Sequence, residues 1–477
     1  MLAERIYTSL PLFAQNWLVS LQGRRLHQQR YGARAFTCAL EELTANESAP
    51  IDQLRCLQLL RLREFARHCY HRSPYYRQAF DQAGITPDDI RSLDCLSRFP
   101  ITAKETMRRH VDRFFTEGRS PRMTAVHTSG TTGSPLTVYF SPADITTRYA
   151  LLERCRAWAG VAIGEPRATF SGKNVVPPHQ QGGPYWRFNR YGNQLLFSSY
   201  HLAPENLDRY VTALESFQPQ MIDGYPSAIH VLAEHILRHQ ERFQGRPRAV
   251  LLTAETVLPH QRRAIEAAFH CQVFNQYASS DGAPFISECS RGRLHIRIDS
   301  GVVEILRADD TPALPGEVGE LVVTSFTTHV TPMFRFRTGD TAVPSAETQC
   351  PCGLPFPMVE SILGRVDDLL FTPERGYVGR MDTVFKGLPN SILEAQIVQH
   401  SATVFALRVV PEGRSYRMEH ALRVVSEMQK RLGQVTIAVE VVSSLPRTPR
   451  GKLRAVVNQC ASSLPPELQY EAPEQVN

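Results

Sequence analysis

The sequence lacks any long uninterrupted hydrophobic run. Its apolar N-terminal stretch from Leu10 to Leu21 is broken by Gln15 and Asn16, and it is too short to span a membrane. No small-residue cleavage site follows it, so a secretory signal is not expected. The pattern predicts a helix packed on the body of the protein; a helix lying on a membrane surface is the alternative.

The sequence also has few cysteines, and neither positive nor negative charge predominates strongly. Ten Cys among 477 residues do not make a disulfide scaffold, so a reducing cytoplasm is the expected compartment. Lys and Arg total 53 against 47 Asp and Glu, a net charge of +6. Such a small, dispersed excess does not predict a nucleic-acid partner and is compatible with an anionic small substrate. The 33 Pro and 28 Gly have no fixed period, which excludes collagen-like and solenoid repeats.

The patterns that are present indicate an α/β protein. Residues 1–100 show mostly helical spacing of apolar side chains. A short apolar strand over 248–255, a helix over 261–269 and a strand over 273–277 then alternate, as α/β folds require. Two β-rich segments, 301–307 and 320–325, flank a Pro/Gly turn and predict a hairpin.

The pattern changes after residue 365. We expect a large α/β domain over residues 1–365 and a small α+β domain over residues 366–477. At the start of the small domain Ser391 is followed three residues later by Glu394, the spacing of a capping box. This spacing predicts a helix from Ser391 to about His400.

The rest of the small domain reads as strand, helix and strand. A strand is expected over 404–410 and an amphipathic helix over 416–432. Alternating apolar residues over 435–441 predict a second strand. The apolar face of the helix is expected to carry Met418, Leu422, Val425 and Met428.

A glycine- and hydroxyl-rich segment is the strongest chemical motif. Backbone N–H groups and hydroxyls in such a turn can surround phosphate oxygens. It is not a Walker P-loop, because no Lys-Ser/Thr pair follows its second glycine. An ordinary Ser/Thr/Gly surface loop is the alternative. The candidate phosphate-binding residues are Thr128, Ser129, Gly130, Thr131, Thr132 and Gly133.

Three further polar segments follow predicted strands or turns. Tyr277-Ala278-Ser279-Ser280-Asp281 places an aromatic ring, hydroxyls and a carboxylate in sequence, which can stack a purine, bind a phosphate and hold Mg²⁺. Asp340 lies at a tight turn, where its carboxylate can accept hydrogen bonds from ribose hydroxyls. Lys452 lies on a glycine-preceded loop near the C-terminus, where a lysine is otherwise only a solvated charge.

In this order, these segments resemble the adenylate-forming superfamily of acyl-CoA synthetases, luciferases and peptide-synthetase adenylation domains. The segments 73–77, 99–104 and 224–227 resemble the phenylacetate-CoA ligase family in particular. Those at 15–25, 197–201 and 394–399 are similar to its CapK branch of polysaccharide-cluster proteins. The resemblance runs from about residue 10 to about residue 460.

The resemblance implies a two-step reaction in a large domain closed by a mobile C-terminal lid. A carboxylate attacks the α-phosphate of ATP to give acyl-AMP and pyrophosphate, and a nucleophile, commonly the thiol of coenzyme A, then takes the acyl group. By the same resemblance, residues 128–133 would hold the β- and γ-phosphates. The other implied roles are adenine contact for Tyr277, nucleotide contact for Ser279, α-phosphate contact for Ser280, Mg²⁺ binding for Asp281, ribose binding for Asp340, nucleotide contact for Arg365, the hinge for Asp367 and the adenylation lysine for Lys452.

Departures from the family pattern leave the acceptor open. Ala278 and Asp281 stand where the family usually has Gly and Glu, and residues 371–390 differ from the thiol half-site of CoA ligases. Three hypotheses follow: a ligase transferring an aryl or short acyl group to coenzyme A, a ligase with an amine or hydroxyl acceptor in polysaccharide assembly, or a nucleotide-binding scaffold without catalysis. The sequence names no acid. A homodimer is compatible with the sequence.

Four residues outside these motifs match a metal site. Cys289 and His295 have the spacing C-x₅-H, and Cys350 and Cys352 have the spacing C-x-C. Three thiolates and one imidazole are the ligands of a closed, tetrahedral zinc site. Two unrelated groups of thiols and a surface histidine are the alternative. We predict a structural Zn²⁺, because four protein ligands leave no open position for catalysis.

Overall fold

The computed structural model describes most of the chain. The residues described are 7, 10–118, 120, 122–127, 136–173, 175–177, 180, 182–199, 201–239, 243–257, 259–279, 281–365, 370–374, 376–378, 381, 384, 391–447 and 453–460.

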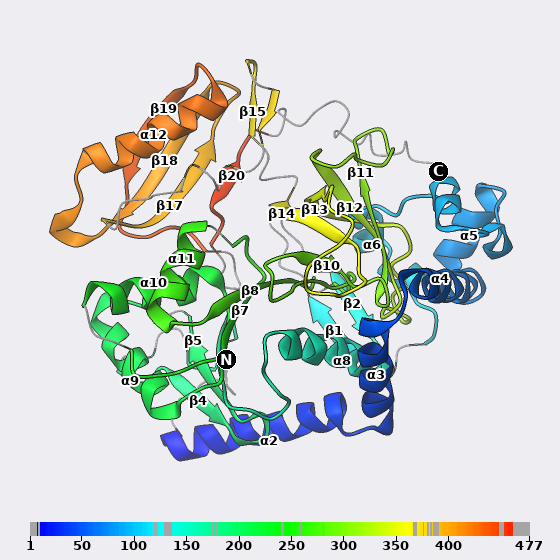
Figure 1. The fold of residues 1–477 in the computed structure, drawn as a ribbon, viewed down its shortest axis with the longest axis horizontal. Coiled ribbons are helices and arrows are strands. Elements are labelled where there is room, and N and C mark those ends of the chain that lie inside the picture. The colour runs from blue at the N-terminus through cyan, green and yellow to red at the C-terminus, as the bar shows by residue number, and fades with distance from the viewer. Residues whose placement is uncertain are drawn as a thin grey trace.

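Helices dominate the first hundred residues, as predicted. The main ones are α2 (Leu12–Tyr31), α3 (Arg34–Ala45), α4 (Ile51–Arg72) and α5 (Pro74–Gln82). Helix α5 begins where its sequence directs, since Pro74 opens the first turn and the Ser73 side chain accepts the N–H of Tyr76. Helix α2 lies along one edge of the molecule and α4 along another (Figure 1). Among the described residues, no helix is long and apolar enough to cross a membrane.

A twelve-stranded mixed sheet forms the centre of the large domain. Its parallel part contains five neighbouring strands in the order β8-β7-β6-β3-β5. The predicted alternation is confirmed at 248–277, where the structure has β7, α11 (Pro259–Phe269) and β8. The predicted hairpin is β11 (Gly301–Leu306) paired with β12 (Gly319–Ser325). The parallel strands are β3 (Arg167–Ser171), β5 (Gln194–Ser198), β6 (Met221–Gly224), β7 (Ala249–Thr253) and β8 (Gln272–Tyr277).

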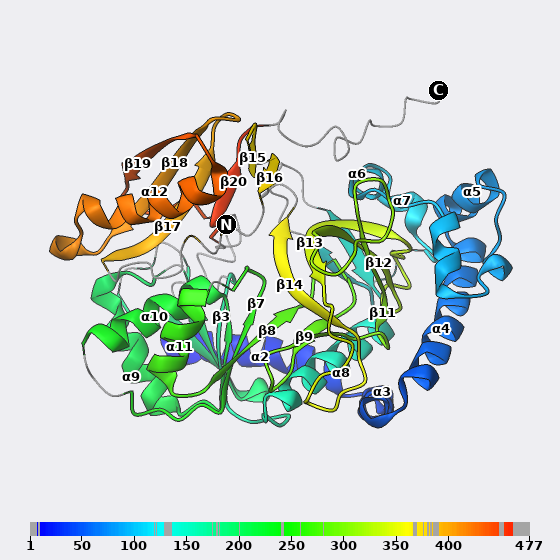
Figure 2. The same ribbon diagram turned by 45° about the horizontal axis from the view of Figure 1, so that its top comes forward.

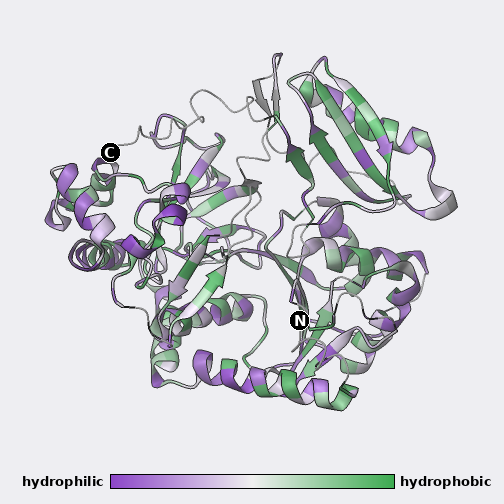
Figure 3. Cartoon of the chain, turned by 180° about the vertical axis from the view of Figure 1, so that it is seen from behind, coloured by the Kyte–Doolittle hydropathy of each residue, from purple (hydrophilic) through white to green (hydrophobic). Residues whose placement is uncertain are grey.

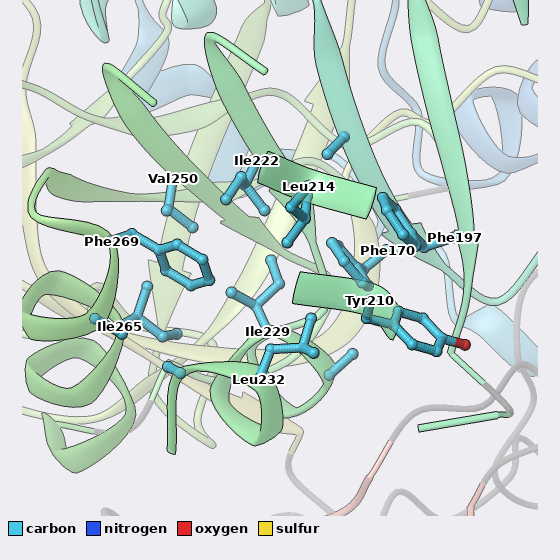
Figure 4. Packing of buried hydrophobic residues seen from close by; sticks show 14 of the residues in the cluster. Phe170, Phe197, Tyr210, Leu214, Ile222, Ile229, Leu232, Val250, Ile265 and Phe269 are labelled. Atoms are coloured by element: carbon cyan, nitrogen blue, oxygen red, sulfur yellow. The ribbon is translucent and has the colours of Figure 1, made fainter. Parts of the chain in front are cut away.

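Alternate residues of the parallel strands serve opposite faces of the sheet. Ile222 and Val250 pack with α9 (Leu207–Phe217), α10 (Pro226–Arg238) and α11 in the main core, where Phe170 and Phe197 stack (Figure 4). Their neighbours Met221 and Ala249 face the other side, beside Ala159 and Val161 at the end of α8 (Pro142–Trp158). Both faces are buried, so the carboxyl ends of the strands are where polar groups can gather.

The remaining strands of the large sheet extend it on both sides. Strand β4 (Trp186–Asn189) is the outermost strand next to β5. Beyond β8, at the other side, the sheet continues with β9 (Ile286–Glu288), β10 (Leu294–Ile296), β14 (Met358–Arg365) and β13 (Phe336–Pro344).

The C-terminal segment forms a separate sheet above the carboxyl ends of the parallel strands (Figure 2). Four strands run in the order β19-β18-β17-β20, covered by α12 (Met418–Leu432). The predicted strand at 404–410 is β18 (Val404–Pro411), and that at 435–441 is β19 (Thr436–Val441). The other two are β17 (Ile392–Gln399) and β20 (Val456–Asn458).

The helix predicted from Ser391 to His400 is wrong, because this segment is β17. The Ser391 hydroxyl lies 2.6 Å from Nδ1 of His420 and caps no helix. Ile392 and Ile397 instead enter the small core, and the backbone pairs with β18 on one side and β20 on the other. Two ladders and a buried face outweigh a local capping signal.

The helix predicted over 416–432 is α12, but its buried face is turned from the predicted one. Val425 and Met428 are buried as predicted, whereas Met418 and Leu422 are 49% and 51% exposed. The positions that complete the buried face are Ala421, Val424 and Leu432.

Candidate active site

Part of the predicted site lies at the carboxyl end of the parallel strand β8. Strand β8 ends at Tyr277, just before Ser279 and Asp281. The glycine- and hydroxyl-rich segment lies between β1 (Thr124–His127) and β2 (Thr137–Phe140), whose adjoining ends pair, His127 with Thr137. Four parts of the predicted site lie outside the described residues: Thr128–Gly133, Ser280, Asp367 and Lys452.

Tyr277 and Asp340 meet although 63 residues separate them. The Tyr277 hydroxyl donates a hydrogen bond of 2.8 Å to Oδ2 of Asp340. Burial, with the two nearby carboxylates of Asp340 and Asp281, raises the pKa of Tyr277 well above its usual value, so its hydroxyl remains a donor. In the ladder between β13 and β14 the register partner of Asp340 is Arg365. The structure thus brings together the residues predicted to bind adenine and ribose and the backbone of a third predicted residue.

Asp281 is almost completely buried and paired with a lysine. Its side chain is 3% exposed, and Nζ of Lys104 lies 3.1 Å from its Oδ2. The Ser279 hydroxyl donates to the other oxygen, Oδ1. Nζ of Lys104 also donates to the carbonyl oxygen of Thr338, at 3.3 Å. The sequence patterns did not single out Lys104 as a functional residue, because its partner is 177 residues away.

One carboxylate here fits a Mg²⁺ site. Magnesium keeps several waters and is usually bound by one or two carboxylates together with substrate phosphates. Asp281 supplies the carboxylate. Lys104 holds a positive charge beside it, so a bound cation would share Asp281 with this lysine.

Arg148 of α8 holds the turn that follows β8. Its guanidinium donates to the carbonyl oxygens of Ser279, Gly282 and Ala283 at 2.9–3.2 Å. Burial lowers the pKa of Arg148 to about 10, while the nearby carboxylate of Asp281 raises it, so the side chain stays charged at neutral pH. Three carbonyl contacts fix the backbone on both sides of Asp281. The sequence patterns gave no signal for this role.

The C-terminal sheet contacts the strand ends through five residues, which we call the lid clasp: Ser227, Glu255, Glu394, Arg447 and Leu453. Arg447 donates to the Ser227 hydroxyl at 3.0 Å and forms an ion pair with Glu394. Glu255 accepts the backbone N–H of Leu453 at 2.9 Å and that of Ser227 at 3.0 Å. Burial raises the pKa of Glu255, although these donors lower it.

Two clasp residues, Arg447 and Leu453, lie on either side of Lys452 in the sequence. Arg447 and Leu453 form an isolated antiparallel bridge with each other, and Lys452 directly precedes Leu453 in the chain. Both bridge residues are bonded to the large domain, at the first turn of α10 and just after β7. The clasp therefore holds the two ends of the segment that carries the predicted adenylation lysine.

The four predicted metal ligands come together. Sγ of Cys289 lies 3.7 Å from Sγ of Cys350, and Sγ of Cys352 lies 3.4 Å from Nε2 of His295. All four ligand atoms lie within 4.8 Å of one another. A tetrahedral zinc with Zn–S bonds of about 2.3 Å has S···S edges of about 3.8 Å, close to the distance observed.

The surroundings orient these ligands. Nδ1 of His295 lies 2.9 Å from the carbonyl oxygen of Phe356, so this nitrogen carries the proton and Nε2 points to the thiols as an acceptor. Burial raises the pKa of Cys352 to about 12. A cation at the centre would favour the thiolate instead. The geometry fits zinc, and zinc binding itself stays a prediction.

Comparison with known proteins gives a consistent picture. Residues 370–459 match the family model of the CapK C-terminal domain. The chain is 31% identical to protein CapK of Staphylococcus aureus over 458 residues, 95% of this chain and 98% of that protein. It is 28% identical to a phenylacetate-coenzyme A ligase of Thermus thermophilus over 408 residues, covering 83% and 87% of the two chains.

The fold is also that of a solved 2-hydroxyisobutyryl-CoA ligase. Its postadenylation state with 2-HIB-AMP matches at a TM-score of 0.68, with 21% identity over 87% of this chain and 91% of that one. The same enzyme in its thioesterification state, with 2-HIB-AMP and CoA, matches at 0.56, with 21% identity over 87% and 92%.

Proposed function

The chain belongs to the family of phenylacetate-CoA ligases and CapK proteins, and from this we propose that it is an adenylate-forming ligase. It activates a carboxylic acid with ATP, forming acyl-AMP and releasing pyrophosphate, and then transfers the acyl group to coenzyme A. The observation that carries the proposal is the clasp, in which Arg447 and Leu453, the residues on either side of the Lys452 segment in the chain, bond to residues just after the carboxyl ends of β6 and β7.

In the first step an oxygen of the substrate carboxylate attacks the α-phosphorus of ATP. The bond between that phosphorus and the bridging oxygen breaks, and pyrophosphate leaves with the electron pair. Asp340 and Tyr277 are placed to hold the nucleoside, because their side chains are already oriented by a mutual hydrogen bond. When bound, Mg²⁺ offsets charge on the phosphates.

Two anions meet in this step, so a cation is needed where charge accumulates. Lys452 supplies it in this proposal, and Leu453 and Arg447, on either side of it in the chain, are bonded to the large domain. Lys104 contributes a second positive charge on the opposite side of Asp281 from Ser279. A stationary lysine on the large domain and a lysine on the lid would therefore act on the same step.

In the second step the sulfur of coenzyme A attacks the acyl carbonyl carbon and AMP leaves. We propose that the clasp opens before this step, so that the lid moves away and admits the acceptor. The polar contacts of the clasp suit that purpose, since each can be exchanged for water. Asp367 is the proposed hinge for the movement.

The Cys–His cluster is proposed to hold one structural Zn²⁺. Cys289, His295, Cys350 and Cys352 would provide all four ligands. The metal would join the turn after β9 to the segment before β14, where Cys350 and Cys352 lie. We assign it no step in the reaction, because such a site has no open position.

One observation favours a second kind of acyl acceptor. The lid, which would face the acceptor, matches the CapK C-terminal domain over residues 370–459. An amine or hydroxyl group of a sugar in surface-polysaccharide assembly is therefore the alternative to coenzyme A. A cytoplasmic location suits either acceptor.

The test is pyrophosphate release from ATP with a panel of aryl and short carboxylic acids, with coenzyme A, with amino sugars or with no acceptor. We expect acid-dependent pyrophosphate release before any acceptor is added, and turnover only with the true acceptor. Formation of ADP and phosphate would contradict acyl-AMP formation. Nucleotide binding without any pyrophosphate would favour a non-catalytic scaffold.

A further inference from the structure

Helix α2 faces the protein with its polar side. The side-chain oxygen of Asn16 accepts the N–H of Phe188 at 3.0 Å, and the Ser20 hydroxyl donates to the Phe188 carbonyl at 3.2 Å. One turn earlier, Gln15 accepts a hydrogen bond of 2.7 Å from Arg187. These bonds satisfy the open edge of β4, the outermost strand of the sheet.

The side of α2 next to these contacts presents large apolar side chains to solvent. Phe13 is 76% exposed, Trp17 is 64% exposed and Leu21 is 48% exposed. They are four residues apart and so form one line along the helix. Leu12 beside them is 41% exposed. A surface helix of a globular protein normally buries such a stripe and turns its polar side outward, so packing within this chain does not account for the arrangement.

Positive charge and a further aromatic ring continue the stripe. Helix α2 has no Asp or Glu, and the exposed Arg24 and Arg25 follow Leu21 within one turn. The guanidinium of Arg24 lies over the Tyr191 ring, 5.8 Å from its centroid, and Tyr191 is 44% exposed. Exposed apolar and aromatic side chains beside arginines offer the two kinds of group that an anionic membrane surface binds, an acyl-chain contact and a phosphate contact.

We propose that α2 binds the surface of an anionic lipid bilayer. Phe13, Trp17 and Leu21 enter the boundary between headgroups and acyl chains, while Arg24 and Arg25 contact lipid phosphates. Helix α2 lies alone along one edge of the ribbon, with apolar and polar residues interspersed along it (Figures 1 and 3). This proposal is independent of the proposed catalytic function.

The size of the stripe favours a bilayer over a second copy of the chain. Each partner in a stable interface buries about 800 Å² from about 20–30 residues, whereas the exposed apolar residues of the stripe are Leu12, Phe13, Trp17, Leu21 and Tyr191. The stripe is one helix wide. A bilayer accepts such a narrow apolar line, because lipids adapt to its shape.

The experiment is sedimentation of the full chain with vesicles of phosphatidylcholine alone or mixed with phosphatidylglycerol. We expect the wild type to sediment with the anionic vesicles. The double variant Phe13→Ser with Trp17→Ser should bind the anionic vesicles at least about tenfold more weakly than the wild type. The double variant Arg24→Gln with Arg25→Gln should bind anionic vesicles roughly 30-fold more weakly than the wild type, because both arginines contact lipid phosphates, and should bind phosphatidylcholine vesicles as the wild type does.

Leu314→Ser is the matched control, because Leu314 is 57% exposed on the turn between β11 and β12. It should bind vesicles like the wild type. Thermal melting and pyrophosphate release without vesicles should be unchanged in every variant, which separates membrane binding from folding and catalysis. The chain has three Trp, and a blue shift of emission with vesicles should disappear in Trp17→Phe while sedimentation persists.

Two results would overturn the proposal. One is equal vesicle binding by the wild type and the Phe13 and Trp17 double variant. The other is a wild type that ignores anionic vesicles but forms a dimer that the double variant loses, which would make the stripe an interface between copies.

Discussion

The strand-end site and the Cys–His cluster are both built on the large sheet, but they are completed in different ways. The strand-end site draws on segments far apart in the chain and is closed by the lid, through Arg447 and Leu453. The cluster draws on strand β10 and the turns near it, and His295 of β10 is held by the carbonyl of Phe356.

This difference in how the two sites are completed suggests a catalytic role for the strand-end site and a structural role for the Cys–His cluster. A site closed by separable polar contacts can change its composition between two reaction steps. A cluster of mostly buried ligands on a paired strand and the turns near it keeps one geometry. Substitutions in the first should therefore alter rates more than stability, and substitutions in the second should alter stability more than rates.

The largest effect is expected from Lys452→Ala. Removing one preorganised electrostatic donor typically lowers the rate roughly 10²–10³-fold, and here the loss should fall on adenylation. Acyl transfer from supplied acyl-AMP and the melting temperature should stay near wild type, because the lysine acts mainly in the transition state of the first step. Rates of the two half-reactions and a thermal melt measure this.

Arg450→Ala is the control for Lys452→Ala, since it removes a neighbouring positive charge. Its adenylation rate should remain within about twofold of wild type, as expected for a surface charge. Near-normal adenylation by Lys452→Ala would show that the lysine is misassigned and would favour the scaffold hypothesis.

Cys350→Ser tests the other side of the comparison. Loss of a metal ligand should lower the free energy of unfolding by about 3 kcal/mol or more, while the fraction that stays folded keeps adenylation activity. Metal analysis of protein purified without chelator should find about one zinc per chain in the wild type and less in the variant. Cys95→Ser, at a cysteine outside the cluster, should change neither. Protein free of zinc, with all four side chains reactive, would contradict the site.

Asp367→Pro tests whether the lid rotates. Proline fixes φ and should hinder movement at the proposed hinge, so the rates of acyl-AMP formation and acyl transfer should fall by different factors. The two half-reactions are measured separately, alongside a thermal melt to detect unfolding. Equal losses in both with an unchanged melt would indicate that the lid does not turn at this residue.

The smallest effect is expected from Glu255→Gln, which keeps the size of the side chain but removes its charge and replaces one of its two accepting oxygens with an NH₂ group. A charge-assisted hydrogen bond is about 1 kcal/mol stronger than a neutral one, so adenylation should slow by about fivefold with acyl transfer unchanged. Glu215→Gln is a matched control, because Glu215 also accepts a backbone N–H, that of Gln244, on the large domain. Slowing of both half-reactions by the same factor would assign Glu255 a purely structural role.

Several parts of the molecule could be predicted from the sequence because their signals are local. The alternation over 248–277 reflects periods of apolar residues that belong to one strand or one helix. The Cys–His cluster was predicted because its residue types alone suit a metal, and the structure brings all four within reach of one ion. The chain order of the polar motifs was enough to indicate the family, which the match to CapK over 95% of the chain confirms.

Other features were decided only by the tertiary structure, since they depend on partners distant in the chain. The segment from Ser391 carries a local helix signal, but two neighbouring strands and a shared core make it β17. The pairing of Lys104 with Asp281 spans 177 residues, and the clasp joins residues of two domains, so no spacing predicts either. The sequence by itself determined which chemical groups are available and the periods of most elements. Only the fold decided which groups meet, because a contact between distant residues depends on the packing of everything between them.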